Sequence, residues 1–196
     1  MDLCTGIYNY MRRVFVTVVI VTAFATPTYA KKVLRVRPAE KYSAKQKQGD
    51  VIVAVKPYLT PKEKKIILGT TTPYMYGVLP ILVVLHNGSD HGLDLKDLKV
   101  RFITPDREGL EPLTEKELLR FRLSTKPNVG LLAELEISEQ IFKAPIIPPR
   151  STVNGFFYYL TRRGLDIIAG GSVYLSGIQN LTTGKKLPYF EIKLKK

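Results

Sequence analysis

The chain has 196 residues, and its 30 lysine and arginine residues against 17 aspartate and glutamate residues give a formal net charge of +13. Hydrophobic residues make up 45% of the chain, which is enough to build a core, and the single cysteine excludes a disulfide-stapled scaffold. The length suits one domain, and the positive charge favours anionic partners.

The first thirty residues have the layout of a signal peptide. Arg12 and Arg13 precede an apolar run over residues 14–25, and the segment ends in Thr28-Tyr29-Ala30. The run is shorter than the roughly 20 apolar residues that a membrane-spanning helix needs, so an uncleaved anchor is the second alternative. We expect residues 1–30 to be removed and the mature chain, which then has no cysteine, to be periplasmic or secreted without an integral membrane span.

Residues 31–49 are strongly basic, with seven lysine and arginine residues against the single acid Glu40. This composition is typical of a flexible arm, which salt-sensitive attraction would hold at an anionic envelope surface. A solvated linker without a binding role is the alternative. Nucleic acid is not expected as a partner, because no aromatic residues alternate with the basic ones. The candidate binding residues in the arm are Lys31, Lys32, Arg35, Arg37 and Lys41.

From residue 50 to residue 196 the hydrophobic residues recur mainly with a period of two, which indicates strands with a buried face. The expected strands are residues 50–56, 78–85, 97–103, 131–137, 153–160, 172–178 and 187–194. The strand at 78–85 is apolar on both faces, with Pro80 near its beginning. Seven short strands between turn residues predict an all-β, antiparallel sandwich or barrel.

Two short helices are expected in loops between these strands. Thr60-Pro61-Lys62-Glu63 has the spacing of a capping box, with proline at the first helical position, and Gly69 would end that helix. Thr114-Glu115-Lys116-Glu117 repeats the threonine and glutamate spacing. We expect both helices to be loop insertions and not layers of the core.

Both histidines lie in the segment His86-Asn87-Gly88-Ser89-Asp90-His91. Neighbouring residues in one turn cannot form a catalytic triad, and a zinc ion would need a third converging ligand. We interpret the segment as a turn in which Asn87-Gly88 supplies positive φ, while Ser89 and Asp90 bond to the local backbone. No catalytic residue, metal ligand or cofactor is therefore predicted.

The aromatic run Phe156-Phe157-Tyr158-Tyr159 suggests a second binding surface. Alternate residues of a strand face opposite sides, so one pair of these aromatic residues would be core and the other would be exposed. In the exposed case Tyr159, Arg162 and Arg163 would form an amphipathic platform for a glycan or a partner protein. The alternative is a strand buried on both faces.

The segments LPILVVLHNGSDHGLDLKDLKVRFITPD (residues 79–106) and IPPRSTVNGFFYYL (residues 147–160) resemble secreted bacterial immunoglobulin-like domains. In those domains an apolar strand ends in a His/Asn-x-Ser-Asp turn, and a later strand led by proline carries glycine and aromatic residues. The resemblance implies an immunoglobulin-like sandwich of about seven strands and a role in binding or envelope assembly. The cysteine pair of antibody domains is missing, and the fold alone assigns no function.

Together these features predict a signal peptide over 1–30, a basic flexible arm over 31–49 and a β-sandwich over 50–196. The expected function is that of a non-enzymatic module which binds an anionic envelope surface or another envelope protein. A periplasmic chaperone or assembly subunit that exchanges a β-strand with a client is the alternative. A wall-directed glycan hydrolase is the third class, and it would need two carboxylates facing one cleft.

Overall fold

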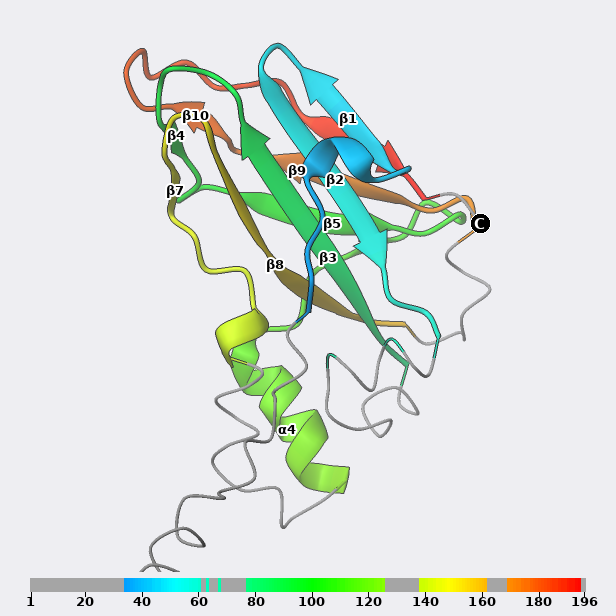
Figure 1. Cartoon of the computed structure of the whole chain (residues 1–196). Helices are drawn as coiled ribbons and strands as arrows, with labels where there is room; N and C mark the ends of the chain where they lie inside the picture. Colours follow the sequence, from blue (N-terminus) through cyan, green and yellow to red (C-terminus); the bar gives the residue numbers. More distant parts are fainter. Residues whose placement is uncertain are drawn as a thin grey trace, which may run out of the picture. The chain divides into compact units, whose positions relative to one another are not determined.

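The computed structural model describes residues 34–60, 63, 67, 77–125, 138–161 and 169–194. This part of the chain is mostly β-structure, with eleven strands in three antiparallel sheets (Figure 1). Its elements in chain order are the 3-10 helix η1 (Ala39–Lys41), strands β1 (Lys45–Gln48), β2 (Val51–Pro57), β3 (Val78–Asn87), β4 (Leu93–Asp94), β5 (Lys99–Ile103) and β6 (Gly109–Leu110), helix α4 (Glu115–Thr125), and strands β7 (Ile146–Ile147), β8 (Ser151–Leu160), β9 (Ser172–Ser176), β10 (Gln179–Asn180) and β11 (Phe190–Lys193). No helix within the described ranges is long and apolar enough to cross a membrane.

The first four-stranded sheet has the strand order β1-β2-β3-β8. Strand β3 pairs with β8 along its whole length and with β2 on its other side. The residues of β3 from Val78 to Leu85 are all buried, because both faces of the sheet are covered at this strand. The sequence expectation for this apolar run is thereby confirmed.

The second four-stranded sheet has the order β11-β9-β5-β6, and the two-residue strands β10, β4 and β7 form a small third sheet. Strand β5 alternates as predicted, since Val100 and Phe102 are buried while Lys99 and Arg101 are exposed. The exposed side chains show that this sheet has one face toward the core and one toward solvent.

One hydrophobic core lies between the two four-stranded sheets. Its members include Val53, Ile81, Val83, Leu85 and Tyr159 from the first sheet, and Val100, Phe102, Val173, Leu175, Phe190 and Ile192 from the second. The alternation of β2 and β3 sends every second residue into this core. The remaining residues of these strands face the opposite side of the first sheet.

A second hydrophobic cluster covers that opposite face. It combines Ile52, Ala54, Leu82, Val84, Phe156 and Tyr158 of the sheet with Ala39 and Tyr42 of the N-terminal segment and with Leu118 of α4. Figure 1 shows η1 lying across β2 and β3. Helix α4 lies in the connection between β6 and β7, as expected, and its buried Leu118 contributes to this cluster.

Six of the seven predicted strands are observed with shifted ends, and the seventh, 131–137, lies outside the described residues. Both capping boxes are present. The Oγ1 of Thr114 accepts from the Glu117 N–H at 3.3 Å, and Glu117 Oε2 accepts from the Thr114 N–H at 2.8 Å. Thr60 and Glu63 make the same reciprocal pair. Most of the helix expected after Thr60, including Gly69, lies outside the described residues.

The expectation of a flexible arm is wrong for residues 34–49. Ala39, Tyr42 and Ala44 are buried, and β1 pairs with β2 in register. The expected boundary between the arm and the sandwich, at residues 49 and 50, is instead the two-residue turn between β1 and β2. Gly49 has a φ of 56° in this turn. A polar strand can be ordered because its backbone hydrogen bonds to β2 do not depend on the side chains, and charged side chains suit an exposed edge.

Candidate functional site

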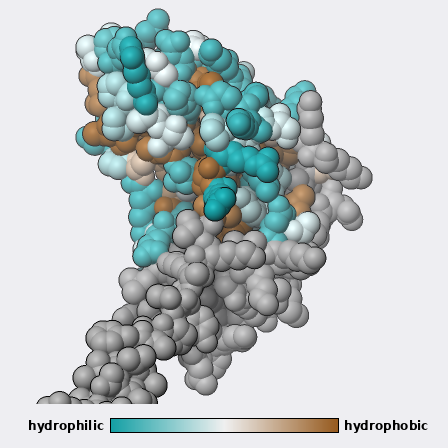
Figure 2. Space-filling model, in the orientation of Figure 1, coloured by the Kyte–Doolittle hydropathy of each residue, from teal (hydrophilic) through white to brown (hydrophobic). Residues whose placement is uncertain are grey.

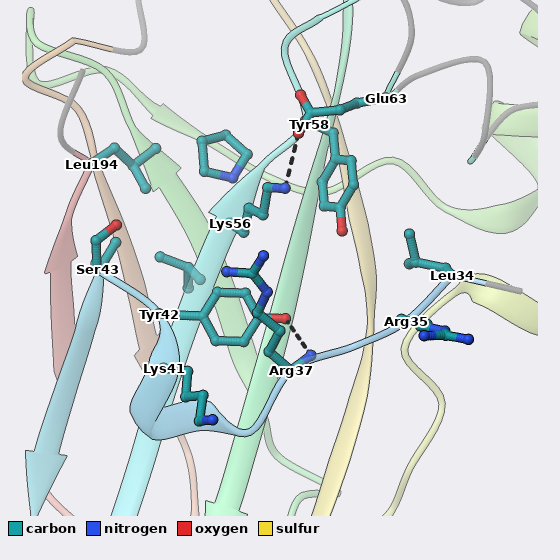
Figure 3. Close-up of a pocket in the computed structure, with 13 residues that line it drawn as sticks. Leu34, Arg35, Arg37, Lys41, Tyr42, Ser43, Lys56, Tyr58, Glu63 and Leu194 are labelled. Atoms are coloured by element: carbon teal, nitrogen blue, oxygen red, sulfur yellow. Dashed lines mark hydrogen bonds and ion pairs between the residues drawn. The ribbon is translucent and has the colours of Figure 1, made fainter.

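The N-terminal segment, the end of β2 and the residue after β11 enclose a pocket of about 540 Å³ (Figure 3). Its volume falls in the range of about 300–1,000 Å³ that is usual for small-molecule sites. The residues that line it are Leu34, Arg35, Arg37, Lys41, Tyr42, Ser43, Ala44, Val55, Lys56, Pro57, Tyr58, Glu63 and Leu194.

The cationic side of the pocket comes from the segment before β1. This segment is extended, and alternation directs Leu34 toward the second hydrophobic cluster and leaves Arg35 and Arg37 exposed. The buried Tyr42 closes the turn after η1, and its hydroxyl accepts a hydrogen bond from the Arg37 N–H at 3.1 Å. Lys41, the last residue of η1, also lines the pocket.

Lys56 and Tyr58 form the part of the pocket that belongs to the sheet. Lys56 Nζ lies 2.9 Å from a Glu63 carboxylate oxygen and 4.5 Å from the centre of the Tyr58 ring. Burial raises the pKa of Tyr58 to about 12, helped by nearby Tyr42 and Glu63 and opposed by Arg37. Partial burial alone would raise the pKa of Glu63, but hydrogen bonds from Lys56 and Thr60 outweigh it and lower the pKa.

The pocket carries an excess of positive charge. Among its described lining residues, four are basic and one, Glu63, is acidic, and the carboxylate of Glu63 is already paired with Lys56. Arg35, Arg37 and Lys41 make no ion pair with any residue in the described part of the chain. Three cations are therefore left to attract an anion.

The structure brings together three of the residues singled out from the sequence, namely Arg35, Arg37 and Lys41. The other predicted binding residues, Lys31, Lys32, Arg162 and Arg163, lie outside the described residues. Lys56 and Tyr58 were missed. The sequence pattern could have predicted the side of the sheet on which Lys56 lies. Ile52, Ala54 and Lys56 are alternate residues of one strand, so they face the same side, that of the second cluster.

The expectation of an exposed platform around Tyr159 is wrong. Tyr159 has no exposed surface, its ring centre lies 5.9 Å from that of Phe102, and its hydroxyl donates a 3.5 Å hydrogen bond to the Val100 carbonyl. Phe156 and Tyr158 on the other face of β8 are buried as well. The alternative, a strand buried on both faces, holds for Phe156, Tyr158 and Tyr159, while Phe157 is partly buried.

An aromatic pair that the sequence reading did not single out lies on the second sheet. Tyr174 and Tyr189 stack with their ring centres 5.1 Å apart, and Tyr189 is 55% exposed. Tyr174 pairs with exposed Arg101 on one side and exposed Glu191 on the other. The cationic pocket is the stronger candidate site, because several basic side chains line one concavity there.

The histidine segment is a turn, as expected, but the interactions that hold it differ from those predicted. Neither Asn87 nor Gly88 has positive φ. Instead the buried Asn87 amide donates to the carbonyls of His91 and Pro148, at 2.7 and 3.0 Å, and accepts from the Ser89 N–H. Within the described residues there is no group of three or more potential metal ligands.

The chain matches no family model and no curated protein. Its function therefore has to be inferred from its own residues. The cationic pocket provides the geometry for that inference.

Proposed function

We propose that this protein is an exported, non-enzymatic binding module of the cell envelope, with an immunoglobulin-like sandwich fold. The observation that carries the proposal is the pocket in which Arg35, Arg37 and Lys41 have no acidic partner among the described residues. Basic side chains that line a concavity attract anions and can hold them by charge-assisted hydrogen bonds. The partner is accordingly an anionic component of the envelope.

The N-terminal sequence supports export. Its basic residues, apolar run and final Thr28-Tyr29-Ala30 have the order of a signal peptide. An exported domain without a disulfide must be stable through its core, and two antiparallel sheets with a common core suit that requirement. The same two layers support the immunoglobulin-like assignment.

The chemistry of the pocket supports binding more than catalysis. Glu63, the one carboxylate that the structure describes in the lining, is paired with Lys56 and has a lowered pKa, so it is a poor proton donor near neutral pH. Sugar hydrolysis uses two carboxylates across one cleft. We therefore rank the glycan hydrolase below the binding module.

Other segments already bond to both edges of the first sheet, so we rank strand exchange below the binding module. On β8 the carbonyls of Phe156 and Tyr158 accept hydrogen bonds from the N–H groups of Phe142 and Leu113. On the opposite edge, the side chain of Gln46 accepts from the N–H of Glu191 at the start of β11. A client strand would have to displace these contacts before it could pair.

The proposal is tested by co-sedimentation of the purified protein, as its expression host processes it, with envelope membranes at low and high salt. The double variant Arg37→Gln/Lys41→Gln should lose most of the binding at low salt, because two of the three free cations are removed. Lys99→Gln/Lys193→Gln is the matched control, since it removes the same charge from exposed positions of the second sheet. Equal binding by both variants would refute a specific pocket.

A further inference from the structure

We infer that the ligand of this pocket is a phosphate monoester carried on an apolar chain. The inference rests on the proposed function and adds the chemical class of the ligand. It follows from three properties of the pocket: the number of free cations, the apolar part of the lining and the volume. Each is taken in turn below.

The charge of the pocket matches a phosphate group. Arg37 and Lys41 supply two cations, with Arg35 as a third at the end of the pocket beside Leu34, and a phosphate monoester offers about −1.5 to −2 charges and three terminal oxygens (Figure 3). Guanidinium groups bind such oxygens in pairs, and the lysine adds a point charge. A carboxylate has one charge and two oxygens, so it would leave part of this cation set uncompensated.

Part of the remaining pocket lining is apolar. The residues that contribute hydrocarbon surface are Leu34, Ala44, Val55, Pro57 and Leu194. Figure 3 shows Leu194 and Ser43 at one end of the pocket, and Arg35 with Leu34 at the other. A ligand with both a charged and an apolar part satisfies this lining, because its apolar part removes hydrocarbon surface from water.

The volume leaves room for a ligand larger than an inorganic anion. A pocket of about 540 Å³ has room for a molecule of many heavy atoms, and a phosphate ion alone has five. The pairing of Lys56 with Glu63 neutralises the charge on the sheet side. The phosphate therefore belongs beside Arg37 and Lys41, with the apolar chain directed along the hydrocarbon lining.

Two sources of this chemistry are possible, a lipid headgroup within a membrane and a free amphipathic phosphate. The experiment distinguishes them with two sets of probes. Isothermal titration uses ethyl, butyl and hexyl phosphate, with inorganic phosphate and hexanoate for comparison. Flotation uses phosphatidylcholine vesicles with and without phosphatidic acid.

We expect hexyl phosphate to bind at least about tenfold more tightly than inorganic phosphate or hexanoate, with affinity rising along the alkyl series, because each buried methylene adds to binding. Arg37→Gln/Lys41→Gln should weaken hexyl phosphate at least about tenfold. Lys99→Gln/Lys193→Gln should leave it unchanged. Flotation that requires phosphatidic acid would assign the lipid source, and binding of the soluble phosphates alone would assign the free source.

The inference is overturned if affinity does not depend on chain length, if hexanoate equals hexyl phosphate, or if the pocket variant binds like the control. These results are separable from failure of the proposed function. Envelope binding that requires Arg37 and Lys41, with no affinity for any alkyl phosphate, would retain the anionic partner and reject the phosphate class. Loss of both kinds of binding would reject both proposals.

Discussion

Asn87 shows how one side chain can hold three segments together. Its amide nitrogen bonds to His91 on one side of the turn and to Pro148 ahead of β8, and its amide oxygen accepts from Ser89. The side chain is completely buried, so these bonds form away from water. Removal of this amide would break several hydrogen bonds at once, although the His91 and Pro148 carbonyls also accept from the hydroxyls of Ser89 and Ser151.

Asn87→Ala is expected to lower the free energy of unfolding by about 1–3 kcal/mol, because it removes the hydrogen bonds of a buried amide, while the hydroxyls of Ser89 and Ser151 still reach the two carbonyls. Urea unfolding followed by circular dichroism would measure the change. Asn154→Ala, at an exposed position of β8, is the matched control and should change stability by less than about 0.5 kcal/mol. Equal stability of the two variants would contradict the role given to Asn87.

Tyr58 makes the free energy of unfolding depend on pH in the alkaline range. Its pKa is about 12 in the folded state, whereas an unfolded tyrosine ionises near pH 10. Between these values the unfolded chain releases a proton that the folded chain retains. The stabilisation associated with Tyr58 is therefore complete below about pH 10 and is lost as the pH rises toward 12.

Tyr58→Phe should make stability fall less steeply between pH 10 and 12 than in the wild-type protein, because residue 58 then no longer ionises in the unfolded chain. The measurement is the urea midpoint at several pH values in this window. Tyr189→Phe, at an exposed position, is the control and should keep the wild-type slope. A parallel decline in all three proteins would show that Tyr58 is not linked to folding.

At the scale of elements, the segment that leads into β1 both covers the first sheet and forms the cationic side of the pocket. Ala39 packs in the second cluster, and the Tyr42 hydroxyl accepts a hydrogen bond from the Arg37 N–H. The position of Arg37 therefore depends on the folding of this segment. Binding and stability are coupled here. A change that detaches the segment should reduce both.

Ala39→Arg is expected to destabilise the segment by at least about 2 kcal/mol, since it introduces a large charged side chain at a site that is 1% exposed. Limited trypsin digestion would reveal this, because basic residues from Arg35 to Lys47 become cleavable when the segment detaches. Ser43→Arg adds the same side chain at an exposed position and should stay resistant. Rapid cleavage of the wild-type segment would restore the flexible-arm interpretation.

At the scale of the whole molecule, the charge is large and the core is without cross-links. The face shown in Figure 2 is mainly hydrophilic, with smaller hydrophobic patches between the polar side chains. The net charge of +13 favours solubility and attraction to anionic surfaces. The only cysteine, Cys4, belongs to the expected signal peptide. Export would therefore give a protein whose stability does not depend on disulfide formation.

Expression in a bacterium with a secretion pathway should yield a protein whose N-terminus is Lys31, because the expected cleavage follows Ala30. Intact-mass measurement would establish the cleavage site. The mature protein should unfold at the same urea concentration with and without a reducing agent, because it contains no cysteine. Retention of the first thirty residues would support the anchor alternative.

The sequence predicted much of the β-structure because alternation is a local property that the chain carries with it. Lys99 and Arg101 face outward and Val100 and Phe102 inward as expected, and both capping boxes form from residues three positions apart. The short strands β4, β6, β7 and β10 were not predicted, because a two-residue bridge has no period that a sequence can display.

The sequence by itself determined the all-β character, the basic excess and the identity of three pocket cations. Only the tertiary structure decided that residues 34–49 are ordered, that Tyr159 is buried and that Lys56 and Tyr58 line the same pocket as the arginines. The physical reason is the range of the interactions. A polar strand such as β1 is held by backbone bonds to β2, and burial of Tyr159 depends on a facing sheet, so neither is encoded in the local pattern of residues.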